Sequence, residues 1–154
     1  MSYQYLPQSL VLLIDDSSID NFVNQKMIER NRFAKEIISF KKAGNAIKYL
    51  SDLDEKQNDD SAIPSLIFLD INMPLINGFQ FIEIYENFSS YIKSRCKIVI
   101  LTNTINPIEI NQINNNKNIL AFLNKPLIDS NFVKIHELLR ENSEQSELKL
   151  KNVG

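Results

Sequence analysis

The chain has 154 residues, a net charge of −2 and 44% hydrophobic residues. Length and composition of this kind indicate one globular domain with a sizeable core. The near-neutral charge gives no reason to expect a nucleic-acid or anionic-membrane partner. No apolar run is long enough to span a bilayer, and the first residues lack the basic and apolar regions of a signal peptide. Because the single Cys96 cannot form an internal disulfide, we expect a cytoplasmic protein.

Short apolar runs, each closed by polar or turn residues, predict five β-strands. In chain order these runs cover residues 9–14, 36–40, 66–70, 97–101 and 119–123. The segments between them carry apolar residues at helical spacing. In the first segment Ile19, Phe22, Val23 and Met27 recur in this way, which predicts a helix to about residue 30. Further helices are expected to begin near residues 44, 79, 107 and 130.

Strands that alternate with helices predict an α/β fold, with a five-stranded parallel sheet covered by helices on both faces. Neither a sequence repeat nor a linker separates a second domain. From residue 143 onward the chain is mostly polar, which predicts a frayed end. We therefore expect one domain over residues 1–142 and a polar C-terminal tail over residues 143–154.

The third strand runs directly into an acidic residue. Four apolar residues precede Asp70, and turn-forming residues follow it. Such a run is typical of a strand buried on both faces, where an unpaired carboxylate would be costly. In open α/β sheets, ligands bind outside the carboxyl ends of the strands. Asp70 is therefore the first candidate for a chemical role.

The ends of the other strands also carry reactive side chains. Asp15 and Asp16 follow the first strand, Thr102 the fourth, and Lys125 the fifth. Because these ends share one edge of a parallel sheet, we expect the side chains to converge on Asp70. Clustered carboxylates repel each other, and Mg²⁺ with its preference for oxygen ligands would relieve that repulsion. Lys125 and Thr102 would then bind phosphoryl oxygens, with Asp70 as the nucleophile.

The order of these residues resembles the receiver domain of two-component response regulators. The matching positions are Asp15-Asp16, Asp70 with Met73-Pro74 and Gly78 behind it, Thr102, and Lys125-Pro126. The resemblance covers roughly residues 9–142 and implies a single-domain receiver, similar to chemotaxis regulators, with no output domain. It also implies the doubly wound, flavodoxin-like (βα)5 fold with strand order 2-1-3-4-5.

The resemblance implies a Mg²⁺-dependent phosphorylation site. Asp70 would be phosphorylated by a sensor histidine kinase or a phosphotransfer protein. Asp16, Asp70 and the backbone carbonyl of Asn72 would ligate Mg²⁺, with Asp15 acting mainly through water. The chain would then signal by changing its affinity for a downstream protein target. It would catalyse only its own phosphoryl transfer and dephosphorylation, so it is expected to be a switch rather than an enzyme.

The same resemblance assigns signalling roles. Lys125 would contact the phosphoryl group, Thr102 would move toward it as the switch, and Phe122 would be coupled to Thr102. Two positions depart from the family pattern. Asn103 stands where receivers usually have a very small residue, and it would restrict access to the phosphoryl group. Phe122 replaces a frequent Tyr and so lacks a hydroxyl.

Two other functions compete with this reading. The first is a receiver fold that binds partners without being phosphorylated, for which Asn103 leaves room. The second is a phosphatase that works through an aspartyl phosphate. Many such enzymes have a second Asp two residues after the nucleophile as a general acid, but Asn72 occupies that position and cannot donate a proton in this way. The sequence therefore favours the phosphorylated switch.

Overall fold

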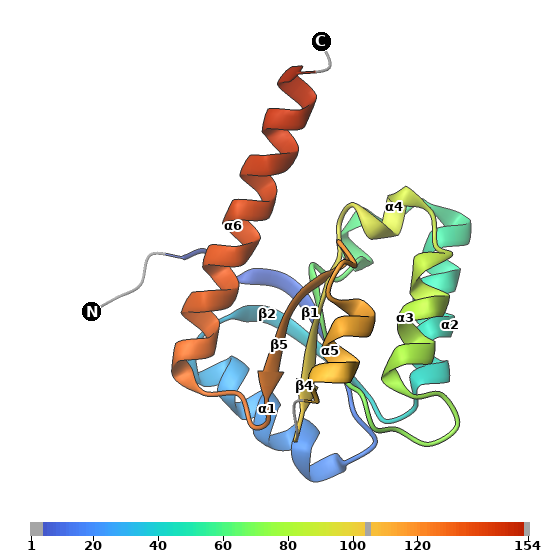
Figure 1. The fold of residues 1–154 in the computed structure, drawn as a ribbon, viewed down its shortest axis with the longest axis vertical. Helices are drawn as coiled ribbons and strands as arrows, with labels where there is room; N and C mark the ends of the chain where they lie inside the picture. Colours follow the sequence, from blue (N-terminus) through green and yellow to red (C-terminus); the bar gives the residue numbers. More distant parts are fainter. Residues whose placement is uncertain (1–4, 104–105, 153–154) are drawn as a thin grey trace.

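The computed structural model describes residues 5–103 and 106–152, and it is an alternating α/β domain (Figure 1). Its elements in order are β1 (Gln8–Ile14), α1 (Ser18–Arg30), β2 (Ala34–Phe40), α2 (Ala43–Lys56), the 3-10 turn η1 (Asp60–Ala62), β3 (Leu66–Asp70), α3 (Gly78–Glu86), α4 (Ser90–Lys93), β4 (Lys97–Thr102), α5 (Pro107–Ile113), β5 (Ile119–Asn124) and α6 (Asp129–Asn152). None of the helices in these ranges is long and apolar enough to cross a membrane.

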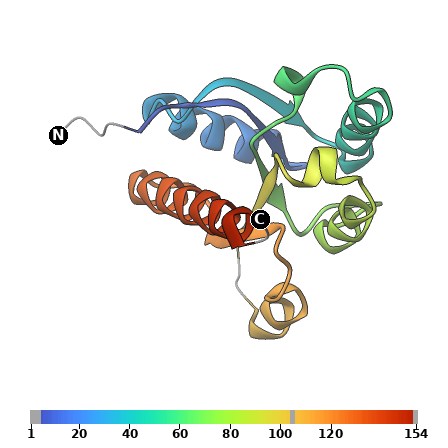
Figure 2. The ribbon, with the colours of Figure 1, turned by 90° about the horizontal axis from the view of Figure 1, so that it is seen from above.

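The five strands form one parallel sheet in the order β2-β1-β3-β4-β5. This order confirms the predicted doubly wound, flavodoxin-like fold. Every residue of β3 is buried, as expected of a central strand covered on both faces. One face of the sheet packs against α1 and α6, and the other packs against α2, α3 and α4. Figure 2 shows these two groups of helices on opposite sides of the strands.

Two differences from the predicted elements have local causes. The short helix α4 was not predicted, because four residues with only Ile92 buried leave too little periodic signal. The segment predicted as a frayed tail instead continues α6 to Asn152. This segment is rich in Glu, Gln, Leu and Lys, which favour helix, and no Pro or Gly interrupts it. Figure 1 shows this half of α6 projecting beyond the sheet.

Helix α1 is present where predicted, but its apolar spacing does not mark its buried face. Ile19, Phe22 and Val23 are exposed to 74%, 61% and 37%. The helix instead turns Asn21 and Asn24 inward, with exposures of 6% and 2%. Since buried amides require hydrogen-bond partners, this inversion is stable only because neighbouring loops supply them.

Gly78 is required for the close approach of α3 to the end of β3. Its N–H donates to the carbonyl of Ile71 at 2.8 Å. A Cβ on Gly78 would lie 2.7 Å from the Cα of Ile71 and 2.9 Å from the carbonyl oxygen of Asp70. Both contacts are with backbone, which cannot move aside without shifting the loop behind Asp70.

We therefore expect Gly78→Ala to lower the free energy of unfolding by roughly 1–3 kcal/mol, as overpacking of a tight site does. Gly44→Ala in α2 is the matched control, because its added Cβ would meet only the Ile76 Cδ1 at 4.0 Å. The control should be neutral or slightly stabilising, since Ala favours helix over Gly by up to about 1 kcal/mol. Urea titrations measure both effects. Equal stability of the two variants would contradict the steric argument.

Candidate functional site

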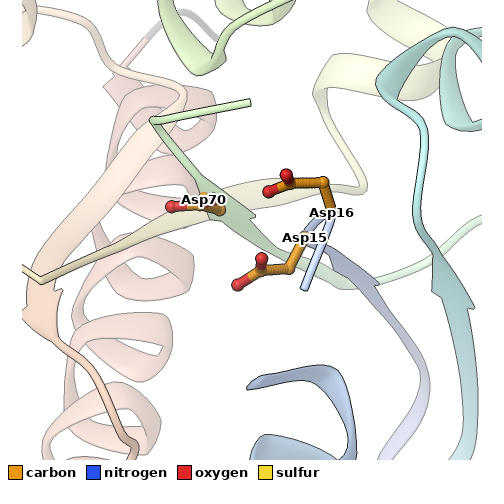
Figure 3. A group of neighbouring side chains, drawn as sticks. All are labelled: Asp15, Asp16 and Asp70. Carbon is orange, nitrogen blue, oxygen red and sulfur yellow. The ribbon is translucent and has the colours of Figure 1, made fainter. Parts of the chain in front are cut away.

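Three carboxylates meet at the carboxyl ends of β1 and β3 (Figure 3). Asp15 and Asp16 directly follow β1, and Asp70 is the last residue of the neighbouring β3. One oxygen from each of the three lies within 4.8 Å of the others. Asp15 and Asp70 are both 4% exposed, whereas Asp16 is open to solvent. The structure therefore brings together the acids that the sequence places at strand ends.

Lys125 reaches this group from the loop after β5. Its Nζ lies 2.6 Å from Asp15 Oδ2 and 3.2 Å from Asp70 Oδ1. The lysine side chain is only 6% exposed. A buried ammonium is stable only when it is paired in this way. Ion pairs of Lys125 thus connect the loop after β5 to the ends of β1 and β3.

Asp20 is a further partner of Lys125 that the sequence reading missed. Its Oδ2 accepts a hydrogen bond from Lys125 Nζ at 3.0 Å, across 105 residues of sequence. Asp20 lies in the first turn of α1, after the cap that Ser17 provides. Its proximity to the Asp15-Asp16 pair in the sequence was the available signal, but Asp20 lies in a helix and not at the end of a strand. Among the described residues, the group of possible metal ligands includes Asp15 and Asp16 but not Asp20.

The inward-facing asparagines of α1 fix the loops on both sides of the site. Asn21 Nδ2 donates to the carbonyl of Asp15 at 2.9 Å. Asn24 Oδ1 accepts from the N–H of Leu127 at 3.1 Å, just after Lys125. Asp15 Oδ1 is held in turn by the N–H of Ser17 at 2.9 Å. These bonds explain why α1 buries two amides beside Ile28 while Ile19, Phe22 and Val23 stay exposed.

The remaining predicted residues lie around this centre. Thr102 is buried at the end of β4, and its carbonyl accepts from the N–H of Lys125 at 2.9 Å. Asn103 is exposed and lines a cavity of about 200 Å³ together with Lys125 and Asp20. The exposed Asn72 donates its N–H to Asp70 Oδ1 at 3.4 Å.

Phe122 lies one step further from the acids. It pairs in register with Ile100 of β4 and is partly buried against the core on the α2 and α3 side of the sheet. Because Ile100 and Thr102 both belong to β4, a coupling of Phe122 to Thr102 would pass along this strand. Its signalling role stays a prediction.

Burial and neighbouring charges shift the pKa values of Asp70 and Lys125. Burial raises the pKa of the Asp70 carboxyl, and the charge of Asp15 raises it further, against the opposing effect of Lys125. Burial alone would lower the pKa of Lys125, but its hydrogen bonds to Asp15 and Asp20 outweigh this and raise it. Lys125 is therefore a permanent cation, and the acids around it outnumber it.

The donor set suits a hard divalent cation. The carboxylates of Asp15, Asp16, Asp20 and Asp70 would carry −4 when ionised, and Lys125 supplies +1, which leaves −3. Mg²⁺ prefers carboxylate, carbonyl and water oxygens. An exposed Asp16 beside two buried acids gives a cation both ligands and access from solvent.

The raised pKa of Asp70 predicts a pH-dependent gain in stability for Asp70→Asn. The folded protein holds the Asp70 proton to higher pH than the unfolded chain, so stability from this group is full below about pH 4 and is lost as pH rises through the folded pKa. In EDTA at pH 7 the variant should be more stable by about 1 kcal/mol or more. The difference in the free energy of unfolding between the variant and the wild type should become smaller toward pH 4.

Urea titrations at both pH values measure this effect. Asp52→Asn is the control, because Asp52 is an exposed acid on α2. It should change stability little at either pH. A loss of stability at pH 7 for Asp70→Asn would show that Lys125 outweighs burial and Asp15.

Comparison with known proteins agrees with this geometry. A family model described as the response regulator receiver domain matches residues 11–137. The response regulator Rcp1 of Synechocystis sp. (strain ATCC 27184 / PCC 6803 / Kazusa) is 30% identical over 107 residues, which is 69% of each protein.

Solved structures give the same result. A two component response regulator from Cytophaga hutchinsonii superposes with a TM-score of 0.77 at 27% identity, over 88% of this chain and 99% of the other. A response regulator receiver protein from Dyadobacter fermentans DSM 18053 gives 0.71 at 28% identity, over 86% and 96%. These matches confirm the resemblance to the receiver domains of response regulators. The chain belongs to the response regulator receiver domain family.

Proposed function

We propose that this receiver is the phosphoacceptor of a two-component phosphorelay, with Asp70 as the phosphorylated residue. The observation that carries the proposal is the meeting of Asp70 with Lys125 at 3.2 Å, beside Asp15 and Asp16. A structural role alone would not require this many acids around one lysine. The donor is a histidine kinase or a phosphotransfer protein, as the family implies.

In the proposed step a carboxylate oxygen of Asp70 attacks the phosphorus of a phosphohistidine. The new P–O bond forms as the P–N bond breaks, and the imidazole nitrogen leaves with the electron pair. Lys125 stabilises the negative charge on the transferred oxygens. Asp16, Asp70 and the backbone carbonyl of Asn72 would hold Mg²⁺, with Asp15 acting through water. When bound, Mg²⁺ would neutralise part of the charge that otherwise opposes transfer.

Phosphorylation would be read at the ends of β4 and β5. Lys125 and Thr102 are already joined through the backbone at 2.9 Å, so a shift of Lys125 toward a phosphoryl group acts directly on the end of β4. Thr102 and Phe122 would transmit that shift and change the affinity for a downstream protein. Asn103, beside Lys125, would slow phosphoryl exchange by narrowing access.

The competing proposal is a receiver that binds partners without phosphorylation. A receiver of that kind would not need a buried Lys125 surrounded by three carboxylates, so we do not favour this proposal. Phosphorylation with a small donor separates the two proposals.

Acetyl phosphate with Mg²⁺ should add one phosphoryl group to the wild-type protein, seen by intact-mass measurement. Asp70→Asn should lose the adduct while remaining folded, because the amide keeps the shape and removes the nucleophile. Asp52→Asn should keep it. EDTA should suppress the adduct in the wild type and in Asp52→Asn. A wild-type protein that never acquires the adduct would favour the competing proposal, and an adduct mapped to another residue would remove Asp70 from its role.

The exposed apolar residues of α1 suit the docking of the protein donor. Ile19, Phe22 and Val23 are exposed on the helix that also carries Asp20 and borders Lys125. Ile128, 54% exposed, lies in the loop after β5 that also carries Lys125. Exposed apolar patches on a small domain commonly mark interaction sites. A donor that docks here would bring its phosphohistidine to the edge of the site.

We expect Phe22→Ser to slow phosphotransfer from the cognate kinase by roughly tenfold, the loss of about 1.4 kcal/mol typical of an interface anchor. Phosphorylation by acetyl phosphate should be unchanged, since Phe22 does not contact Asp70. Ile108→Ser on α5 is the control, because Ile108 is a similarly exposed apolar residue, at 69%. Equal slowing by both variants, or slowing with acetyl phosphate, would contradict docking on α1.

A further inference from the structure

A second surface lies at the opposite edge of the sheet from Asp70. Two hollows of about 850 and 590 Å³ adjoin there and share Ser94, Lys97 and Asn142 in their walls. We call the two together the basal groove. Lys97 begins β4, whereas Thr102 ends it, so the groove and the acidic cluster are separated by the length of a strand.

The walls of the basal groove come from α6 on one side and from the segment between α4 and β4 on the other. Figure 1 shows α6 running past the sheet on this side, which leaves its flank uncovered by other elements. Leu120, Leu138 and Leu139 contribute partly buried apolar surface to the groove. Leu6, 85% exposed, adds a further apolar contact.

The groove is strongly basic in a protein whose net charge is −2. Its lining contains the cations Lys93, Arg95, Lys97, Lys117 and Arg140, against one carboxylate, Glu141. Arg95 is paired with Asp60 at 3.6 Å. Within the described part of the chain, neither Lys117 nor Arg140 lies in an ion pair. Among the described lining residues, positive charge is therefore in excess of negative charge.

Lys97 has the least favourable position of these cations. It is partly buried, and its Nζ donates only a long hydrogen bond of 3.5 Å, to the carbonyl of Lys93. Burial lowers its pKa, and the neighbouring charge of Lys117 lowers it as well. The negative charge of an anion in the groove would act in the opposite direction and favour the charged form of Lys97.

We propose that the basal groove binds an acidic, leucine-containing segment of a partner protein. Its carboxylates would pair with Lys97, Lys117 and Arg140, and its apolar side chains would cover the leucines between them. A nucleic acid fits less well, because the net charge of −2 repels a long polyanion, and the described lining residues include no Phe, Tyr or Trp on which bases could stack. The partner would leave Asp70 accessible.

The test is the binding of a short, labelled Glu/Leu peptide, followed by fluorescence anisotropy. The test variant is Lys117→Glu with Arg140→Glu, since both residues are exposed and their replacement should not affect folding. The control variant is Lys48→Glu with Lys134→Glu, which makes the same change in net charge at exposed lysines outside the groove. A Gln/Leu peptide and a single-stranded RNA serve as alternative ligands.

We expect the wild type and the control variant to bind the Glu/Leu peptide, with an affinity that falls as salt is added. The groove variant should bind at least tenfold more weakly, and the Gln/Leu peptide should bind weakly to all three proteins. Hydrogen exchange should slow in residues 93–97 and 138–142 on binding. Absence of wild-type binding, equal binding by the two variants, or preferential binding of RNA would overturn the proposal. Phosphorylation by acetyl phosphate reports separately on Asp70.

Discussion

The pairing of Lys125 with the surrounding carboxylates is the interaction on which the functional end of this protein depends. One buried ammonium contacts Asp15, Asp20 and Asp70 within 3.2 Å. These acids come from the ends of two strands and the first turn of α1, so their mutual repulsion would open the edge of the sheet without Lys125. The lysine only partly balances them, and the remaining negative charge makes the edge receptive to a divalent cation.

The parallel sheet makes this concentration of charge possible. All five strands end at one edge, and the two that carry the acids are adjacent. Gly78 lets α3 begin close behind Asp70, while Asn21 and Asn24 bind the loops that precede and follow the site. Hydrogen bonds between these asparagine side chains and the loop backbone therefore hold the loops in place, while Asp16 stays open to solvent where a cation can reach it.

The two edges of the sheet have opposite charge. The carboxyl edge gathers acids around a single lysine, and the amino edge gathers lysines and arginines around a single glutamate. Such a separation leaves the net charge near neutral while each edge attracts a different class of ligand. The strand β4 joins the two edges, with Lys97 at its start and Thr102 at its end.

The sequence by itself determined the fold and most of the site. Apolar runs that end near Asp15, Asp70, Thr102 and Lys125 are local signals, and the carboxyl ends of parallel strands share one edge of a sheet; the strand order came from the resemblance to receiver domains. Only the tertiary structure decided that Asp20 joins them, because its bond to Lys125 spans 105 residues. It also decided which face of α1 is buried. The helical spacing of apolar residues did not predict the buried face of α1, because the hydrogen bonds of Asn21 and Asn24 to the neighbouring loops set the orientation of the helix.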